Sequence, residues 1–204
     1  MSDFRKFVTL NTEFLEINFL KNSLEVKKMN ETLNVLKTRR SCRKFKAEMI
    51  KDDELSQILE AGTYAPSGHN AQSSIIIAVT NKELRNKISA ENAKIMGRPA
   101  DFDPFYGAPV ILIVLADKKE VNHVYDGTLV MGNLMNAAAA LGLGSIWIHR
   151  AKEEFESDFG KEILKSLNIE DDYEGIGHVA LGYKEEGGEA KAAPRKPDYV
   201  YYVK

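Results

Sequence analysis

The sequence has little cysteine and no excess of charge of either sign. Cys42 is the only cysteine among the 204 residues. One thiol can neither form a disulfide within the chain nor begin a zinc site built from cysteine pairs, so we expect a reducing, cytoplasmic compartment. The 28 Lys and Arg residues nearly balance the 30 Asp and Glu residues, for a formal net charge of -2. We therefore predict no nucleic-acid partner and no polybasic contact with a membrane.

Long hydrophobic runs are also lacking. The longest weakly charged stretch, 124–148, holds Asp126 as its one formal charge. Its asparagines and glycines interrupt the roughly 20-residue apolar span that a membrane helix needs. Residues 1–28 carry acidic side chains throughout and do not show the pattern of a secretory signal. These absences predict a protein that neither crosses a membrane nor is exported.

The remaining composition is typical of a folded domain. Hydrophobic residues make up 44% of the chain and charged residues 28%. Residues 1–28 show neither helical nor strand periodicity, so we interpret them as an N-terminal extension and 29–204 as one domain. Within that domain, helices are predicted near 30–38, 53–62, 82–92, 125–141 and 153–167, and strands near 75–79, 110–116, 145–148 and 177–183.

Two segments of the domain need a partner. The helix at 125–141 has the composition of a helix buried on all sides, with small residues that allow another backbone to approach. The segment 199–203, Tyr-Val-Tyr-Tyr-Val, has the composition of a strand but no strand close to it in sequence. It could pair with the edge of a sheet, including the sheet of another subunit.

Basic side chains are concentrated in one segment. Residues 37–46 hold six Lys and Arg residues and no acidic residue. Guanidinium groups, the Ser41 hydroxyl and backbone N–H groups could together bind a phosphate, and the alternative is a solvated basic helix end. A second cluster, Arg195 with Lys196, is flanked by prolines. It could close over the same anion, or it could form an ordinary surface turn.

A loop of small and polar residues precedes the first predicted strand. In residues 66–70, the backbone at Gly68 can approach a flat ligand closely, and Ser67 and Asn70 can hydrogen-bond to its polar edge. The stretch 96–109, with aromatic residues at 102, 105 and 106, could cover such a ligand. The alternative for that stretch is an ordinary packed loop.

Sharper chemistry is not evident. Residues 175–180 match the spacing G-x-G-x-x-A, but they enter a strand, whereas a dinucleotide fingerprint follows a strand and opens a helix. The four histidines lack metal-ligand spacing, so we predict no metal site. Basic neighbours of Cys42 would favour a thiolate, yet a packed small side chain is the simpler interpretation. An anion site with no evident acid, base or nucleophile suits a cofactor that carries its own chemistry.

Five motifs, in their order along the chain, resemble the FMN-dependent nitroreductase family. They are RRSCRKF at 39–45, APSGHNAQ at 65–72, the run 133–148 that ends in GLGSIWI, GHVALGY at 177–183 and PRKP at 194–197. The resemblance covers residues 30–204. One departure concerns Ser73 and Ser74, which stand where family members usually have Pro-Trp. The packing beside the ring and the substrate preference therefore stay open.

The resemblance implies an α+β fold and a dimeric assembly. The fold would be a mixed, largely antiparallel sheet flanked by helices. Two chains would form an intertwined homodimer with two FMN sites at the subunit interface. The helix at 125–141 would be the central helix of the dimer, and 199–203 would be a C-terminal strand exchanged onto the partner's sheet.

The family's FMN-binding residues carry over to three groups. In the first, Arg39, Ser41 and Arg195 would hold the phosphate, Arg40 would contribute through its backbone, and Arg43 would reach the pyrimidine edge of the flavin. The second group, Pro66, Ser67, Gly68 and Asn70, would face the ring from the second subunit. The third group is Trp147, Ile148, His149 and Arg150, whose backbone would lie against the ring near N5.

The activity implied by the resemblance is a two-step exchange at one face of the flavin. NADH or NADPH would deliver a hydride and leave, and a small-molecule electron acceptor, such as a nitroaromatic or a quinone, would then be reduced in a ping-pong mechanism. No protein residue is predicted to be catalytic, because the chemistry takes place at flavin N5. Two alternatives stay open. The first two motifs also resemble iodotyrosine deiodinase, which implies reductive dehalogenation, and the fold could instead bind FMN as a non-catalytic sensor or store.

Overall fold

The computed structural model describes residues 30–204, and the predicted extension 1–28 lies outside the described residues. Packing divides the chain into two units, Met1–Asn34 and Val35–Lys204. Of the first unit, the structure describes the start of helix α2 (Glu31–Thr38), where Asn30 Oδ1 accepts a hydrogen bond from the Leu33 N–H at 3.2 Å. The second unit holds the sheet and all the elements that follow α2.

The second unit contains a four-stranded antiparallel sheet. Its strands are β1 (Ser74–Val79), β2 (Val110–Asp117), β3 (Gly144–Ile148) and β4 (Tyr173–Gly182), in the spatial order β1-β2-β4-β3. All three pairings are antiparallel. Each predicted strand exists, although β4 begins at Tyr173 and not at 177. The predicted α+β fold class is therefore confirmed.

Strand β2 runs through the middle of the core. Its residues 110–116 are all fully buried. The odd-numbered side chains at 111, 113 and 115 join the hydrophobic cluster on one face of the sheet, and the even-numbered side chains join the cluster on the other face. Because successive side chains of a strand point to opposite faces, burial on both faces requires the continuous apolar run that the sequence shows.

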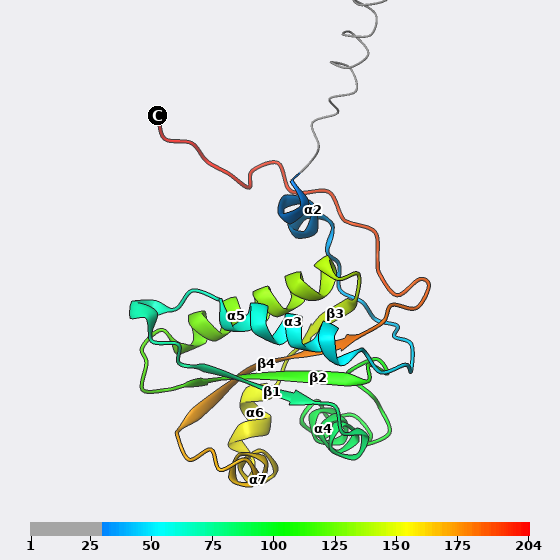
Figure 1. Cartoon of the computed structure of the whole chain (residues 1–204), viewed down its shortest axis with the longest axis vertical. Helices are drawn as coiled ribbons and strands as arrows, with labels where there is room; N and C mark the ends of the chain where they lie inside the picture. Colours follow the sequence, from blue (N-terminus) through cyan, green and yellow to red (C-terminus); the bar gives the residue numbers. More distant parts are fainter. Residues whose placement is uncertain (1–29) are drawn as a thin grey trace, which may run out of the picture. The chain divides into compact units, whose positions relative to one another are not determined.

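Helices cover both faces of the sheet (Figure 1). Helices α3 (Asp52–Thr63) and α5 (His123–Ala140) lie on one face, and α4 (Lys82–Ile95), α6 (Ala151–Glu156) and α7 (Asp158–Ser166) lie on the other. Ile58 and Leu134 fill the cluster under α3 and α5, whereas Ile88 and Phe155 fill the cluster under α4 and α6. The second unit is thus a three-layer arrangement with the sheet in the middle.

The helix predicted at 153–167 is two helices. Ser157 takes an extended conformation, with φ -77° and ψ 164°, and separates α6 from α7. Its hydroxyl oxygen accepts a hydrogen bond from the Gly160 N–H at 3.4 Å and so caps the start of α7. A serine hydroxyl competes for backbone groups in this way, and hydrophobic periodicity alone does not register the competition.

Helix α5 is covered by its own chain on one side only. Leu134 is fully buried on the inner side, but Tyr125 is 72% exposed and Leu129 is 46% exposed. Its own chain therefore covers the helix on one side, and burial of the other side by a second subunit stays a prediction. Composition shows that a surface is apolar, but it does not show whether the same chain covers that surface.

Helix α4 presents a row of polar side chains to the core. Arg85, Ser89 and Asn92 are buried and share one face of the helix. Arg85 Nη2 lies 2.6 Å from Asp103 Oδ2, and the Ser89 hydroxyl donates to Asp103 Oδ1 at 2.7 Å. Asp103 also accepts two backbone N–H groups of its own loop. These contacts anchor the stretch 96–109 to α4.

The aromatic residues of the anchored stretch have different environments. Phe105 is fully buried, and its ring meets the His178 ring edge-on with the centroids 5.3 Å apart. Phe105 is therefore a core residue, and the expectation that it covers a ligand is wrong. Phe102 packs against the Arg98 guanidinium at 4.7 Å, and Tyr106 is 41% exposed. A covering role for these two aromatics stays a prediction.

Replacing Asp103 by Asn should destabilise the fold in a pH-dependent way. Burial by itself raises the pKa of Asp103, but hydrogen bonds from Arg85 and Ser89 outweigh burial and hold that pKa below its usual value. A carboxyl whose pKa is lowered by folding adds stability above its unfolded pKa and loses it as the pH falls through the folded pKa. At neutral pH we expect the unfolding free energy to drop by about 2–4 kcal/mol.

Chemical denaturation of the parent and of Asp103→Asn measures this difference. The two proteins should converge in stability as the pH falls below about 4, toward the most acidic pH at which the parent stays folded. A difference that is the same at neutral and acidic pH would contradict the assigned role of the charge.

Candidate functional site

An extended strap, residues 41–46, connects the edge of the sheet to the C-terminal part of the chain. The Cys42 N–H donates to the Ser145 carbonyl in β3 at 3.0 Å. The next residue, Arg43, donates its N–H to the Gly188 carbonyl at 2.8 Å. These bonds place the basic segment beside both β3 and the turn that follows β4.

Cys42 is the packing centre of the strap. Its side chain is fully buried, and this burial raises the pKa of its thiol. A Cβ on Gly144 would lie 2.8 Å from Cys42 Sγ, and a Cβ on Gly188 would lie 3.0 Å from it. Only glycine lets both backbones approach the sulfur this closely. Cys42 is thus the packed small side chain that the sequence predicts and is no exposed thiolate nucleophile.

The two basic clusters of the sequence line one hollow, which we call the basic hollow. Its volume is about 290 Å³. It is lined by Arg39, Arg40, Ser41, Arg43, Ala190, Lys191, Ala192, Ala193 and Arg195. None of these lining residues is acidic, so their positive charges are not compensated within the hollow. Residues 39–43 and the C-terminal segment thus bring together all five residues that the resemblance assigns to the phosphate and the pyrimidine edge.

The guanidinium groups in the basic hollow are not equivalent. Arg39 Nη1 is buried and has no hydrogen-bond partner among the described residues. Arg40 Nη1 donates to the carbonyls of Lys37 at 2.9 Å and Arg39 at 2.6 Å, and Arg195 Nη2 donates to the Ala193 carbonyl at 2.8 Å. A buried donor without a partner costs free energy unless a ligand satisfies it. A phosphate, with several strong acceptor oxygens, fits this set of groups.

Lys191 is the one cation of the basic hollow that the sequence analysis missed. It stands between Ala190 and Ala192, outside the PRKP motif, and no local sequence pattern indicates a binding role for it. Its position depends on the turn at Gly187, whose φ of 72° is in the left-handed region. That turn returns the chain toward the strap, a long-range event that local pattern does not reveal.

The loop at residues 66–72 holds an unusual backbone. His69, Asn70 and Gln72 have φ values of 53°, 56° and 49°, and each such non-glycine conformation costs roughly 1 kcal/mol. Two contacts hold the loop in this shape. The Ser67 hydroxyl accepts the Gln72 N–H at 3.0 Å, and Asp126 accepts the Gly68 N–H with both carboxylate oxygens, at 3.1 and 3.2 Å.

Asp126 is a second residue that the sequence analysis did not assign. It is 6% exposed and projects from α5, where the sequence shows a single carboxylate in an otherwise apolar helix. A lone buried charge needs a partner. The single carboxylate in this apolar helix is therefore the sequence feature that could have indicated the contact. Its partner is the loop backbone, so the loop at 66–72 is tied to the helix with the exposed apolar side.

A second hollow lies beside this loop and is separate from the basic hollow. Its volume is about 520 Å³, and residues from α3, β1, α5 and the loop line it, including Pro66, Ser67, Ser73 and Ser74. The hydroxyls of Ser73 and Ser74 are buried without a partner among residues 30–204. These serines stand where the resemblance leads one to expect Pro-Trp, so the missing bulk coincides with open volume.

The segment 147–150 continues from β3 into the N-terminus of α6. Ile148 is buried, Trp147 and Arg150 are half-buried and His149 is exposed. Arg150 has φ 78° and ψ 13°, a left-handed conformation that turns the chain into α6. Neither of the two hollows includes this segment. In one chain, therefore, the structure unites the first predicted group of residues but does not join it to the second or third.

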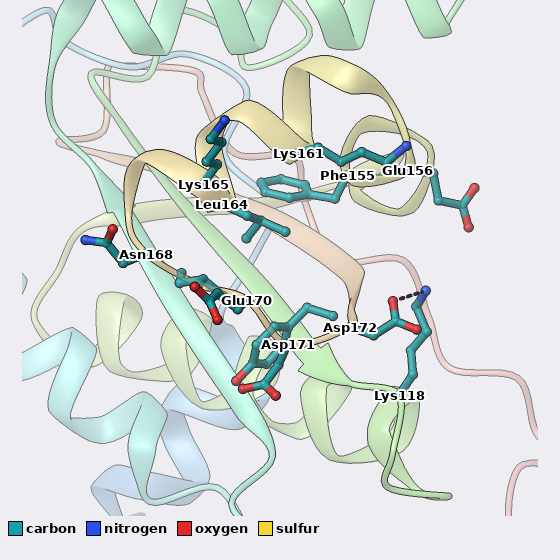
Figure 2. Close-up of a pocket in the computed structure, with 12 residues that line it drawn as sticks. Lys118, Phe155, Glu156, Lys161, Leu164, Lys165, Asn168, Glu170, Asp171 and Asp172 are labelled. Carbon is teal, nitrogen blue, oxygen red and sulfur yellow. Dashed lines mark ion pairs between the residues drawn. The ribbon is translucent and has the colours of Figure 1, made fainter.

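A larger hollow, of about 890 Å³, lies elsewhere in the fold (Figure 2). It opens between α7 and the start of β4, and its rim carries lysines as well as carboxylates. Lys118 and Asp172 pair across 2.7 Å on that rim. None of the predicted site residues lines it. Mixed charges on an open surface explain its polarity without a ligand.

Other site types find no support in the described part of the chain. No group of three or more His, Cys, Asp or Glu side chains there could hold a metal ion. None of the helices within 30–204 is both long and apolar enough to cross a membrane. Residues 175–180 lie inside β4, so the G-x-G-x-x-A spacing does not form the strand-to-helix turn of a dinucleotide site.

Fold and site together describe an α+β protein with a hollow lined by cationic side chains. The strap pairs with β3 and with the turn after β4, and the loop at 66–72 is held by α5. The sequence matches the Nitroreductase family over residues 36–183. The chain therefore belongs to the nitroreductase family.

Individual relatives support this assignment. The chain is 28% identical over 181 residues to an NADPH-flavin oxidoreductase of Vibrio harveyi, covering 84% of this chain and 72% of that protein. A nitroreductase with bound FMN from Bacteroides fragilis matches the structure with a TM-score of 0.77 and 32% identity, over 86% of this chain and 100% of that one. Iodotyrosine deiodinase, solved with FMN and 3-iodo-L-tyrosine, shares the fold with a TM-score of 0.66 and 23% identity, over 85% of this chain and 99% of that one.

Proposed function

We propose that this protein binds FMN and uses it to oxidise NADH or NADPH. The observation that carries the proposal is the basic hollow, where Arg39, Ser41 and Arg195 converge without a carboxylate. The buried Arg39 Nη1 has no partner in the described chain, and a terminal phosphate supplies the oxygen it needs. The relatives named as a flavin oxidoreductase and as a nitroreductase with bound FMN support the same cofactor.

When bound, FMN would supply the redox chemistry that links reduced nicotinamide to an electron acceptor. The residues of the chain bind and orient it. Arg39, Ser41 and Arg195 hold the phosphate, and Arg40 acts through its backbone because its guanidinium is already bonded to carbonyls. Arg43 places positive charge at the pyrimidine edge, where it stabilises the negative charge that reduction brings.

The other two groups of predicted residues orient the ring. We infer that Pro66, Ser67, Gly68 and Asn70 reach it from the second subunit, and that the backbone of 147–150 lies against it near N5. The loop is shaped before any ligand arrives, because Asp126 and its own side chains hold its left-handed residues in place. Such preorganisation lowers the entropy that binding must overcome.

The acceptor step is proposed to follow a ping-pong scheme. NADH or NADPH and a small acceptor, a nitroaromatic or a quinone, would bind in turn at the same place beside the ring. Reductive dehalogenation of an aromatic substrate and non-catalytic FMN storage are the competing functions. They differ from the proposal in the acceptor used and in whether there is turnover at all.

The first test is the colour and turnover of the purified protein. It should contain FMN, or take it up with a stoichiometry of one per chain, and FAD should not replace it, because the basic hollow suits a terminal phosphate. NADH or NADPH should then be oxidised with a nitroarene or quinone, giving parallel double-reciprocal plots. A colourless preparation that shows no FMN binding by fluorescence quenching would contradict the assignment of FMN as the cofactor. Turnover with iodotyrosine alone would favour dehalogenation, and FMN binding without any turnover would favour storage.

The second test separates the roles of Arg43 and Arg195. Arg195→Ala should weaken FMN retention by about 1.5–3 kcal/mol, the cost of one charge-assisted hydrogen bond, and leave turnover per bound flavin near normal. Arg43→Ala should lower the midpoint potential and slow hydride acceptance, because positive charge near the ring is lost. Potentiometry on flavin-saturated variants measures both. An unchanged potential in Arg43→Ala together with a shifted potential in Arg195→Ala would reverse the two roles.

The third test concerns the homodimer, which we infer from two exposed apolar surfaces. Leu129 on α5 is 46% exposed, and residues 199–203 are all more than half exposed. Light scattering should give twice the 22.9 kDa of one chain.

Leu129→Glu should yield monomers that retain little FMN, because a charge would be buried at the interface. Leu167→Glu is the matched control, since Leu167 is 48% exposed but follows α7 on the other face of the sheet. A parent monomer with full FMN occupancy would contradict the inference.

A further inference from the structure

Four polar side chains form a connected group between α4, α6 and β4, which we call the Asn92 network. Its members are Asn92, Arg150, Glu154 and His178. Asn92, Glu154 and His178 have no exposed surface. Buried polar groups are costly unless they are satisfied, so a network at this depth calls for a reason beyond packing.

Asn92 uses its amide group to hold two consecutive residues. Its Nδ2 donates to the His149 carbonyl at 3.1 Å, and its Oδ1 accepts from Arg150 Nε at 3.0 Å. Nδ2 also donates to Glu154 Oε2 at 3.4 Å. One side chain of α4 therefore grips both the backbone and the side chain of the turn between β3 and α6.

The surroundings leave the Asn92 amide a single orientation. Its NH₂ group faces a carbonyl and a carboxylate, both of which are acceptors, and its oxygen faces a guanidinium, which is a donor. Glu154 Oε2 also lies 3.4 Å from His178 Nε2, and the His178 ring is braced by Phe105. Rotation of the amide by half a turn would set like groups against each other on both sides.

The orientation of Asn92 determines the orientation of a peptide plane. The carbonyl and N–H of a planar trans peptide point in opposite directions. Because the His149 carbonyl is bonded to Asn92, the Arg150 N–H is turned away from α4. Arg150 has a left-handed φ of 78° in this arrangement, a conformation that arginine does not favour by itself.

We propose that Asn92 is a positioning residue for the cofactor. It fixes the His149–Arg150 peptide so that the Arg150 N–H is directed to the flavin ring and contributes to its redox potential. The proposal rests on the proposed function, in which the backbone of 147–150 lies near N5. An N–H donor stabilises the oxidised N5, which is an acceptor, over the reduced N5, which carries a hydrogen.

The experiment compares Asn92→Ala with Ser89→Ala. Ser89 is the control because it is buried on the same face of α4 and its side chain hydrogen-bonds to Asp103, not to the turn at 149–150. Both variants should lose thermal stability. Without FMN, hydrogen exchange in the peptide that spans 147–151 should quicken in Asn92→Ala and not in Ser89→Ala, because only Asn92 holds that turn.

With saturating FMN, Asn92→Ala alone should raise the flavin midpoint potential and shift its visible absorption bands. Its FMN dissociation constant should rise about tenfold, as the loss of one well-placed hydrogen bond to the ligand predicts. Arg150→Met removes the Nε donor and leaves the buried side chains of α4 unchanged, so it should raise the potential less. It replaces Asn92→Ala in the test if that variant does not fold. Potential and spectrum equal to the parent in these variants would overturn the proposal, and exchange unchanged from the parent would do so as well. Failure of the parent itself to bind FMN would instead overturn the proposed function. The hydrogen-exchange data would still show whether Asn92 holds the turn at His149 and Arg150.

Discussion

The backbone hydrogen bonds of the strap at 41–46 are the contacts on which the site depends. They run to β3 on one side and to the turn after β4 on the other. Cys42 packs at the point where these three segments meet. Its sulfur lies so close to Gly144 and Gly188 that neither position can hold a larger residue. Without these contacts, the arginines at 39–43 and Arg195 of the C-terminal segment would lie on separate surfaces. The buried Cys42 side chain thus helps to hold together the segments that line the basic hollow.

The local pattern of the chain predicts most elements of the fold. The period-two burial of β2 follows from a continuous apolar run, and the strands at β1 and β3 follow from β-branched residues between turn signals. The concentration of charge at 37–46 is sufficient by itself to indicate an anion site. These features are predictable because each depends on residues close together in the sequence.

The parts that sequence does not predict depend on distant contacts. Asn92 and Asp126 are ordinary polar residues in their own helices, and their importance comes from the loops they bind across the fold. Ser157 divides α6 from α7 through a cap that periodicity does not register. The composition of α5 indicates an apolar surface, but it does not tell what covers the side that is exposed in one chain.

The polar face of α4 shows how one helix can serve two parts of a site. Arg85 and Ser89 anchor the stretch 96–109 through Asp103, and Asn92 holds the turn after β3. Since all three residues lie on one rigid helix, the two segments keep a constant separation. Rigid spacing of this kind suits a ligand that must meet several chain segments at once.

The basic hollow makes folding and ligand binding linked equilibria. Five cationic side chains line it without a carboxylate, so the folded chain carries a mutual repulsion that the extended chain avoids. Any anion that enters relieves the repulsion and shifts the folding equilibrium toward the native state. Binding of an anion there would therefore raise the melting temperature of the protein.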